Sequence, residues 1–224
     1  MLKVGVIGAG NLGETHIKLL QKINDFELVG FFDGDQSLQK NVSQNFNTRA
    51  YGSVDELIGS VDVVDIVKPS ISHFDYAVNS IRQSKHVFIE KPVSNTVDEA
   101  RQLLDLSLEA NVKVQVGHVE RFNPAFKAAL PYITAPMFIE SHRMIEFDAK
   151  KANVPVVMDL MSHDLDIILS VVNSNIKKVS AKGVRVVGDT PDVVNAIIEF
   201  DNGCVANLTA SRISLKNERI SKFY

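Results

Sequence analysis

A glycine-rich turn between an apolar run and a helix constrains this chain more than any other feature. Residues 2–7 read LKVGVI, typical of a buried strand, and residues 14–23 have a helical pattern. Between them lies the G-x-G-x-x-G sequence Gly8-Ala9-Gly10-Asn11-Leu12-Gly13. In such a motif the first glycine allows a tight turn, the second lets a pyrophosphate approach the backbone, and the third lets the helix pack close to the strand. The helix N-terminus adds free N–H groups and a positive dipole end. The motif therefore predicts a dinucleotide-binding unit.

An acidic residue after the next apolar run indicates which dinucleotide binds. The run is Phe26–Phe32, and Asp33 follows it, 20 residues after Gly13. A carboxylate at this position can accept hydrogen bonds from both ribose hydroxyls of NAD, and it repels the 2′-phosphate of NADP. We therefore expect NAD rather than NADP. The alternative is an ordinary strand–helix turn in which Asp33 merely ends a strand.

Composition and charge argue against several classes of function. The chain has 224 residues, a net charge of −3 and 45% hydrophobic residues, so it offers no strongly basic face for nucleic acid. No run approaches the roughly 18 apolar residues of a membrane span. We expect neither nucleic acid nor a membrane as partner. The single cysteine, Cys204, rules out an internal disulfide and fits a reducing compartment, so the expected location is cytoplasmic. The six histidines show no metal-ligand spacing, and no metal is expected.

Strand and helix patterns alternate from the N-terminus to residue 119. Ser53, Ser72 and Thr96 each stand where a helix N-cap is expected. The run 61–67 is apolar enough for a central strand buried on both faces. This order predicts an α/β fold, with residues 1–119 forming a Rossmann-type doubly wound parallel sheet with right-handed crossovers. Ligands bind beyond the carboxyl ends of the strands in such sheets.

From residue 120 to 224 the pattern changes. We expect a helix over 156–172 and strands over 137–147, 179–187, 193–200 and 204–210, joined at Asp201-Asn202-Gly203 by a hairpin turn with positive φ at both central positions. Alternating apolar residues predict an α+β domain whose largely antiparallel, open sheet is covered on one face by the helix. Cys204 then belongs to the core and is not a nucleophile. Residues 218–224 resemble a strand just beginning, so we expect a domain that is incomplete, because the sequence is a fragment or because a partner supplies the last strands.

Two places carry side chains suited to acid–base chemistry. Asp159 and His163 are four residues apart on the expected helix and so share one face, where the carboxylate can orient the imidazole and raise its basicity. The alternative is an ordinary pair on the helix surface. Lys91, whose backbone is restricted by the following proline, can polarise a substrate hydroxyl or carbonyl, or be an exposed lysine of a turn. Asp164 and Asp166 are expected to face solvent or cap the helix.

Together these motifs resemble the glucose-fructose oxidoreductase/inositol 2-dehydrogenase (Gfo/Idh/MocA) family. The glycine motif, Glu90-Lys91-Pro92 and the pair Asp159 and His163 carry the resemblance, which covers essentially the whole chain. Pro69 and His73 match the P-x-x-x-H of the family, and residues 117–124 match its arginine-containing segment. The segments GHVERFNP, DLMSHDLDIIL and NGCVANLTASRIS look most like its UDP-N-acetylglucosamine 3-dehydrogenase-like branch.

The resemblance implies a role for each part of the chain. The first domain would bind NAD(P), and the second would serve substrate binding and assembly into a homodimer or homotetramer through its sheet. Lys91 and His163 would be the catalytic pair, with Asp159 supporting them. The implied cofactor contacts are Gly8, Gly10, Asn11, Leu12, Gly13, Asp33, Pro69, His73 and Glu90, and the implied substrate contacts are Lys91, Arg121, Asp159 and His163. Members of the family are generally longer than this chain.

We therefore expect an NAD-dependent oxidoreductase that moves a hydride between a carbinol of a sugar, nucleotide sugar or cyclitol and the nicotinamide. The same groups would serve reduction, so the direction stays open. Arg121, Arg143 and Arg212 are candidates for a substrate phosphate or carboxylate, and equally for ordinary surface or interface positions. The alternative function is a non-catalytic, NAD-binding regulator, which would not need Lys91 or His163.

Overall fold

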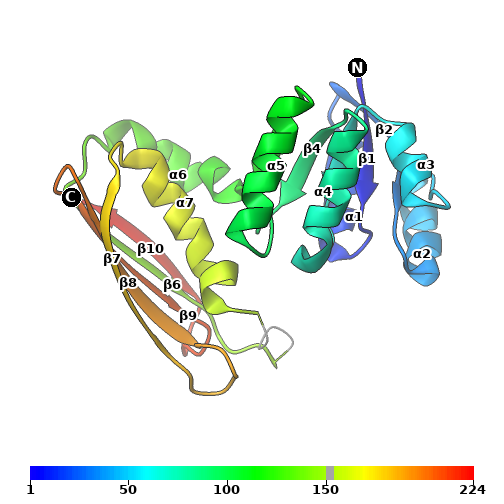
Figure 1. Ribbon diagram of the computed structural model, residues 1–224. Coiled ribbons are helices and arrows are strands. Elements are labelled where there is room, and N and C mark those ends of the chain that lie inside the picture. The colour runs from blue at the N-terminus through cyan, green and yellow to red at the C-terminus, as the bar shows by residue number, and fades with distance from the viewer. Residues whose placement is uncertain (150–153) are drawn as a thin grey trace. The chain divides into compact units, whose positions relative to one another are not determined.

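The computed structural model describes residues 1–149 and 154–224. The chain splits into two compact units, Met1–Gly117 and His118–Tyr224, the second beginning two residues before the expected position. Figure 1 shows that each unit has a sheet and helices of its own.

The first unit is a five-stranded parallel sheet in the order β2-β1-β3-β4-β5. Its strands are β1 (Leu2–Ile7), β2 (Phe26–Phe32), β3 (Val63–Ile66), β4 (His86–Glu90) and β5 (Val114–Gly117). Its helices are α1 (Asn11–Leu20), α2 (Gln36–Phe46), α3 (Val54–Gly59), α4 (His73–Arg82) and α5 (Val97–Glu109). β3 lies at the centre and is almost wholly buried, as its apolar run predicts.

Neighbouring residues of β1 point to opposite faces of this sheet, and each face has its own core. Val6 packs in a cluster with Ile17 of α1 and Val42 of α2. Ile7 packs in a second cluster with side chains of α3, α4 and α5. Period-two alternation in a strand thus distributes the helices over both faces, as a doubly wound sheet requires.

The helix start signals hold with one exception. Thr96 and Glu99 form a full capping box at α5, and Ser53 accepts a hydrogen bond from the backbone N–H of Glu56 at α3. Ser72 stands at the N-cap position of α4 as expected, but its side chain makes no capping hydrogen bond. Its hydroxyl donates to the carbonyl of Pro69 instead, within a 3₁₀ turn at Ser70–Ser72.

The second unit has a sheet in the order β10-β6-β9-β8-β7. Its strands are β6 (Phe138–Met144), β7 (Ile176–Val184), β8 (Val193–Phe200), β9 (Val205–Ser211) and β10 (Glu218–Phe223). All neighbouring pairs are antiparallel except β6 with β9, so the sheet is largely antiparallel as expected. α6 (Pro124–Ala129) and α7 (Ser162–Val171) are its helices, and a π-helical turn at Val157–Met161 precedes α7.

One face of this sheet packs against α7 and the π turn. Ile198 of β8 and Leu208 of β9 are buried there with Leu160 and Ile168. Cys204 is fully buried in the same core, and burial raises the pKa of its thiol, which confirms it as a packing residue.

The β8–β9 hairpin differs from the predicted two-residue turn. Gly203 has a φ of +89°, but Asn202 is not among the residues with positive φ. The backbone N–H of Gly203 donates to the carbonyl of Phe200, and that of Phe200 donates to Cys204. This is a three-residue loop, a type I turn followed by a left-handed glycine. The side chain of Asn202 instead accepts from the backbone N–H of Cys204.

Among the described residues, no helix is long and apolar enough to cross a membrane.

Candidate functional site

The glycine motif forms the turn from β1 into α1, and each glycine has a distinct environment. Gly8 has a φ of +116°, and a Cβ there would lie 2.6 Å from the carbonyl oxygen of Val67. A Cβ on Gly13 would lie 2.0 Å from the carbonyl oxygen of Gly8, which shows how closely the helix packs. A Cβ on Gly10 would meet nothing within 4 Å. The backbone is therefore open at Gly10, the N-cap of α1, where a pyrophosphate fits the exposed N–H groups.

Asp33 stands at the carboxyl end of β2, where the sequence predicts it, but its carboxylate already has partners. It accepts hydrogen bonds from the backbone N–H groups of Ala9 and Asp35 and from the ammonium of Lys68. Burial alone would raise the pKa of Asp33, but these donors, Lys68 foremost, lower it. Sequence reasoning does not single out Lys68, although the end of an apolar run at Lys68-Pro69 marks its position.

His73 connects two strand ends of the first unit. The residue is 1% exposed, with Nδ1 2.7 Å from the carbonyl oxygen of Pro92 and Nε2 2.6 Å from that of Lys68. The residue expected to contact the cofactor thus braces the segments after β3 and β4. Lys91, in the second of these segments, is partly exposed, and its bond to Pro92 is cis.

A buried charge cluster lies between α1 and the strands. His16 Nδ1 is 2.8 Å from Asp65 Oδ2, and His16 Nε2 is 3.5 Å from Glu90 Oε1. Burial alone would lower the pKa of His16, but the two carboxylates outweigh it and raise the pKa to about 9. Burial raises the pKa of Asp65. Glu90 also accepts from the backbone N–H of Lys91, so the cluster reaches the predicted catalytic segment.

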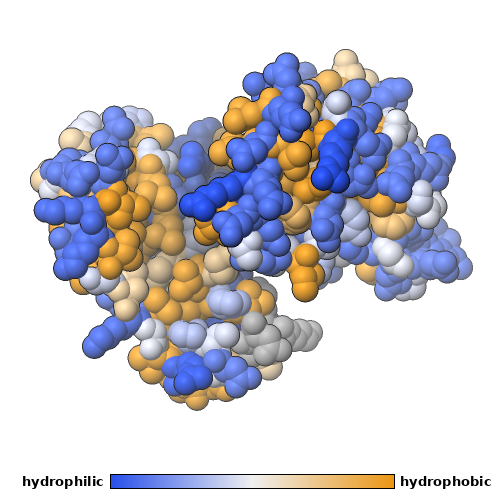
Figure 2. All heavy atoms as spheres, in the orientation of Figure 1, coloured by the Kyte–Doolittle hydropathy of each residue, from blue (hydrophilic) through white to orange (hydrophobic). Residues whose placement is uncertain are grey.

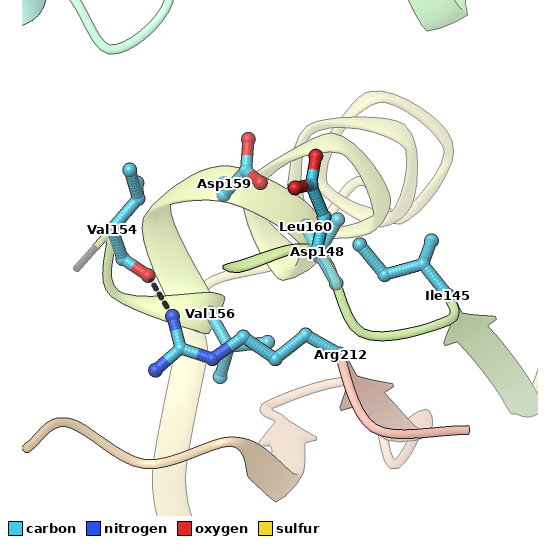
Figure 3. Close-up of a pocket in the computed structure, with 7 residues that line it drawn as sticks. All are labelled: Ile145, Asp148, Val154, Val156, Asp159, Leu160 and Arg212. Carbon is cyan, nitrogen blue, oxygen red and sulfur yellow. Dashed lines mark hydrogen bonds between the residues drawn. The ribbon is translucent and has the colours of Figure 1, made fainter. Parts of the chain in front are cut away.

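In the second unit, Asp159 and His163 lie on different kinds of helical turn. Asp159 belongs to the π turn and His163 to the first turn of α7. A π turn is wider than an α turn, so the four-residue spacing does not give the simple stacking that an α-helix would. Figure 3 shows Asp159 at a small recess that Asp148 and Arg212 also line, with the Arg212 guanidinium donating a hydrogen bond to the carbonyl of Val154.

Glu120 gives His163 an electrostatic partner that the sequence does not reveal. Its carboxylate accepts from the side chains of Asn123 and Arg143. Burial alone would raise the pKa of Glu120, but Asn123, Arg143 and the charge of His163 together lower it. An imidazole beside an ionised carboxylate is suited to take up a proton.

The candidate arginines all pair with carboxylates of their own unit. Arg121 makes a two-pronged contact with Asp166 at 2.7 Å, and Arg143 makes one with Asp164 at 2.8 and 2.9 Å. Arg212 is buried, with its Nε 2.6 Å from Asp192. Asp164 and Asp166 were expected to face solvent or cap the helix, and this prediction is wrong, because both are buried as the acceptors of these pairs. A substrate phosphate at Arg121 would have to compete with Asp166.

Comparison with known proteins agrees with this architecture. Residues 2–118 match the family model described as "Oxidoreductase family, NAD-binding Rossmann fold", and residues 133–221 match the model of the GFO/IDH/MocA C-terminal domain. The two units and the open glycine turn define an oxidoreductase with an NAD-binding Rossmann domain. The chain belongs to the Gfo/Idh/MocA family.

Relatives within the family act on different substrates. The chain is 35% identical over 213 residues to a UDP-N-acetylglucosamine 3-dehydrogenase of Acidithiobacillus ferrooxidans, covering 95% of this chain and 67% of that protein. A solved structure of that dehydrogenase superposes with a TM-score of 0.95 at 34% identity, over 100% of this chain and 74% of the other. The chain is also 26% identical to the NAD(+)-dependent scyllo-inositol 2-dehydrogenase of Bacillus subtilis, covering 95% of this chain and 68% of that protein.

Proposed function

We propose that this protein is an NAD-dependent dehydrogenase of a sugar or cyclitol, with a UDP-sugar as the favoured substrate. The proposal rests on the presence, in one chain, of both a glycine-rich turn open to a pyrophosphate and side chains suited to acid–base chemistry. Gly10 leaves the backbone open to a pyrophosphate, and His163 lies in the field of an ionised Glu120. The similarity to a UDP-N-acetylglucosamine 3-dehydrogenase over 95% of the chain supports the substrate class.

Separate groups of residues would bind the cofactor and carry out the proton transfer. Gly8 to Gly13 receive the pyrophosphate at the N-terminus of α1, and Asp33 accepts from the adenosine ribose, which favours NAD over NADP. When bound, NAD supplies the hydride acceptor. His163 takes the proton from the substrate hydroxyl, and Asp159 supports His163 or the substrate. The ammonium of Lys91 stabilises the negative charge that develops on the substrate oxygen and relays the proton.

The remaining proposed contacts come from side chains beside these groups. Pro69, His73 and Glu90 shape the strand ends around the cofactor, and Arg121 serves the substrate. We also propose a cytoplasmic location, in keeping with a single, buried thiol. Copies of the chain assemble through the face of the second sheet that α7 leaves uncovered.

Nicotinamide absorbance tests the function directly. The purified protein is mixed with NAD and challenged separately with UDP-N-acetylglucosamine, other nucleotide sugars, free sugars and inositols. Reduction of NAD by one UDP-sugar alone is the expected result. Reduction only by a free sugar or an inositol would keep the enzyme class but reject the nucleotide-sugar substrate.

The regulator alternative has its own outcome in the same experiment. If NAD binds tightly and no member of the panel reduces it, the proposed sugar and cyclitol substrates are rejected, and the protein is either an NAD-binding regulator or a dehydrogenase of a substrate outside the panel. If neither NAD nor NADP binds, the cofactor proposal itself is wrong.

A further inference from the structure

Lys68 reaches across the glycine-rich turn to the residue that is proposed to select NAD. β2 and β3 flank β1 on its two sides; Asp33 directly follows β2, and Lys68 lies two residues after the end of β3. A Cβ on Gly8 would lie 3.1 Å from Lys68 Cδ, so the lysine stem runs beside the first glycine of the motif. Its ammonium ends 2.8 Å from Asp33 Oδ1.

The Asp33 carboxylate is almost fully engaged. Its Oδ2 accepts from the backbone N–H of Ala9 at 2.7 Å, and its Oδ1 accepts from the backbone N–H of Asp35 at 3.0 Å as well as from Lys68. Asp33 is 4% exposed, and the Lys68 side chain is 21% exposed. An ionised carboxylate offers about four acceptor positions, so three donors leave little capacity for two ribose hydroxyls.

Solvent reaches Asp33 from an open depression of about 550 Å³, lined by Phe32, Asp33, Gly34, Gln36, Gln39, Lys40, Ser43, Ala50 and Gly52. A ribose that enters this depression meets Asp33 with Lys68 already bound to it. The field that reaches a 2′-phosphate is then that of an ion pair, which falls off faster with distance than the field of an isolated carboxylate. The ammonium is therefore placed to weaken the repulsion on which rejection of NADP depends.

We propose that Lys68 sets the degree to which this site prefers NAD over NADP, by neutralising Asp33 and sharing its hydrogen-bonding capacity. The inference rests on the proposed cofactor role of the glycine turn and Asp33. Lys68 and Asp33 act on the ribose site as one ion pair, so removing either charge leaves the other uncompensated.

Fluorescence titration of NADH and NADPH tests this without any turnover. We expect Lys68→Met to raise the ratio of the NADPH to the NADH dissociation constant by about fivefold or more, since Asp33 then stands as an unpaired carboxylate. Lys68→Arg keeps the positive charge and should keep the ratio within about twofold of the unmodified protein. Lys113→Met is the matched control, because it removes an exposed lysine just before β5, at the opposite edge of the same sheet.

Asp33→Asn tests the pairing from the other side. It leaves the Lys68 ammonium without its carboxylate and free to attract a 2′-phosphate, so the ratio should fall below that of the unmodified protein, and adding Lys68→Met should raise it again. An unchanged ratio in Lys68→Met, or no rise when Lys68→Met is added to Asp33→Asn, would overturn the inference while leaving the cofactor proposal intact. Absence of binding of both NADH and NADPH would overturn the cofactor proposal and this inference with it.

Discussion

His16 ties the helix of the glycine turn to the strand end that precedes Lys91. Its imidazole lies between the carboxylates of Asp65 and Glu90, and only 16% of its side chain is exposed. Because its folded pKa of about 9 exceeds the usual 6.5, the charged form is stabilised by folding. This contribution is fully present below pH 6.5 and is lost as the pH rises through about 9.

We predict a pH-dependent loss of stability in His16→Gln. Near pH 6 the variant should lose about 2 kcal/mol in the free energy of unfolding, since the cost of burying Asp65 offsets part of the gain from the shifted pKa. The difference from the unmodified protein should shrink towards zero by about pH 10. Urea unfolding at a series of pH values measures it, and a difference that does not vary with pH would contradict the charged state of His16.

The proposed catalytic mechanism is tested most directly at Lys91. Lys91→Ala should lower kcat by about 100-fold or more, the range for groups that stabilise developing charge or transfer a proton. NADH affinity should stay close to that of the unmodified protein, because the pyrophosphate is held elsewhere. Steady-state kinetics and NADH titration give the two values, with Lys113→Ala as the control. An active Lys91→Ala enzyme would refute the role of this lysine.

At these residues the sequence predicts positions better than partners. Spacing alone locates Asp33 and the three glycines, because the motif is a local backbone requirement. The roles of Lys68, His16 and Glu120 cannot be predicted from the sequence, because each depends on a contact with a side chain far away along the chain. The prediction for Asp164 and Asp166 is wrong for the same reason. Their charges favour solvent-exposed positions, and the sequence does not show that folding brings Arg143 and Arg121 beside them.

Within the second unit, the pair of Arg143 on β6 and Asp164 on α7 joins the sheet to the helix that carries His163. Both residues are 6% exposed. Removing one partner leaves a buried charge uncompensated, so Arg143→Met should cost about 3 kcal/mol or more in the free energy of unfolding. The double change Arg143→Met with Asp164→Leu should recover much of that loss, because burying two apolar side chains avoids the desolvated charges.

Urea unfolding of the four proteins of this cycle gives the coupling between the two residues. Arg219→Met is the control, since Arg219 also faces Glu120, at 3.5 Å, but its side chain is 66% exposed. That exposed contact should contribute less than about 1 kcal/mol. Equal losses in the free energy of unfolding for Arg143→Met and Arg219→Met would show that the buried Arg143–Asp164 pair stabilises the fold no more than an exposed contact does.

Elements with a clear hydrophobic period could be predicted from the sequence. Details of local backbone geometry, such as a π turn or the length of a hairpin loop, could not. Alternating apolar residues identify β8, β9 and the buried face of the second sheet. The π turn before α7 is not visible in the sequence, because the apolar pattern of a helix hardly changes over one wide turn. Asn-Gly signals a hairpin correctly at 202–203, but the sequence does not choose between a two-residue and a three-residue loop.

At the scale of the whole molecule, each unit has its own hydrophobic core. In Figure 2 the visible surface of the first unit is mostly hydrophilic with scattered apolar residues. The strand pairing of the second sheet puts Phe138, Ile197 and Ile220 on the face opposite the α7 core, where they are 40%, 37% and 39% exposed. Scattered apolar residues need no special explanation, but several on one sheet face are suited to contact between copies.

This arrangement predicts that assembly is sensitive to charge on that face. Ile197→Glu should shift the protein from a dimer or tetramer to a monomer, because burying the new carboxylate at the contact without a partner costs several kcal/mol. Leu104→Glu, on α5 of the first unit, is the control, since it adds the same charge at an apolar side chain that is 59% exposed. Light scattering coupled to size exclusion gives the masses. A monomeric unmodified protein, or equal masses for both variants, would remove the second sheet as the assembly surface and leave the cofactor and catalytic proposals unchanged.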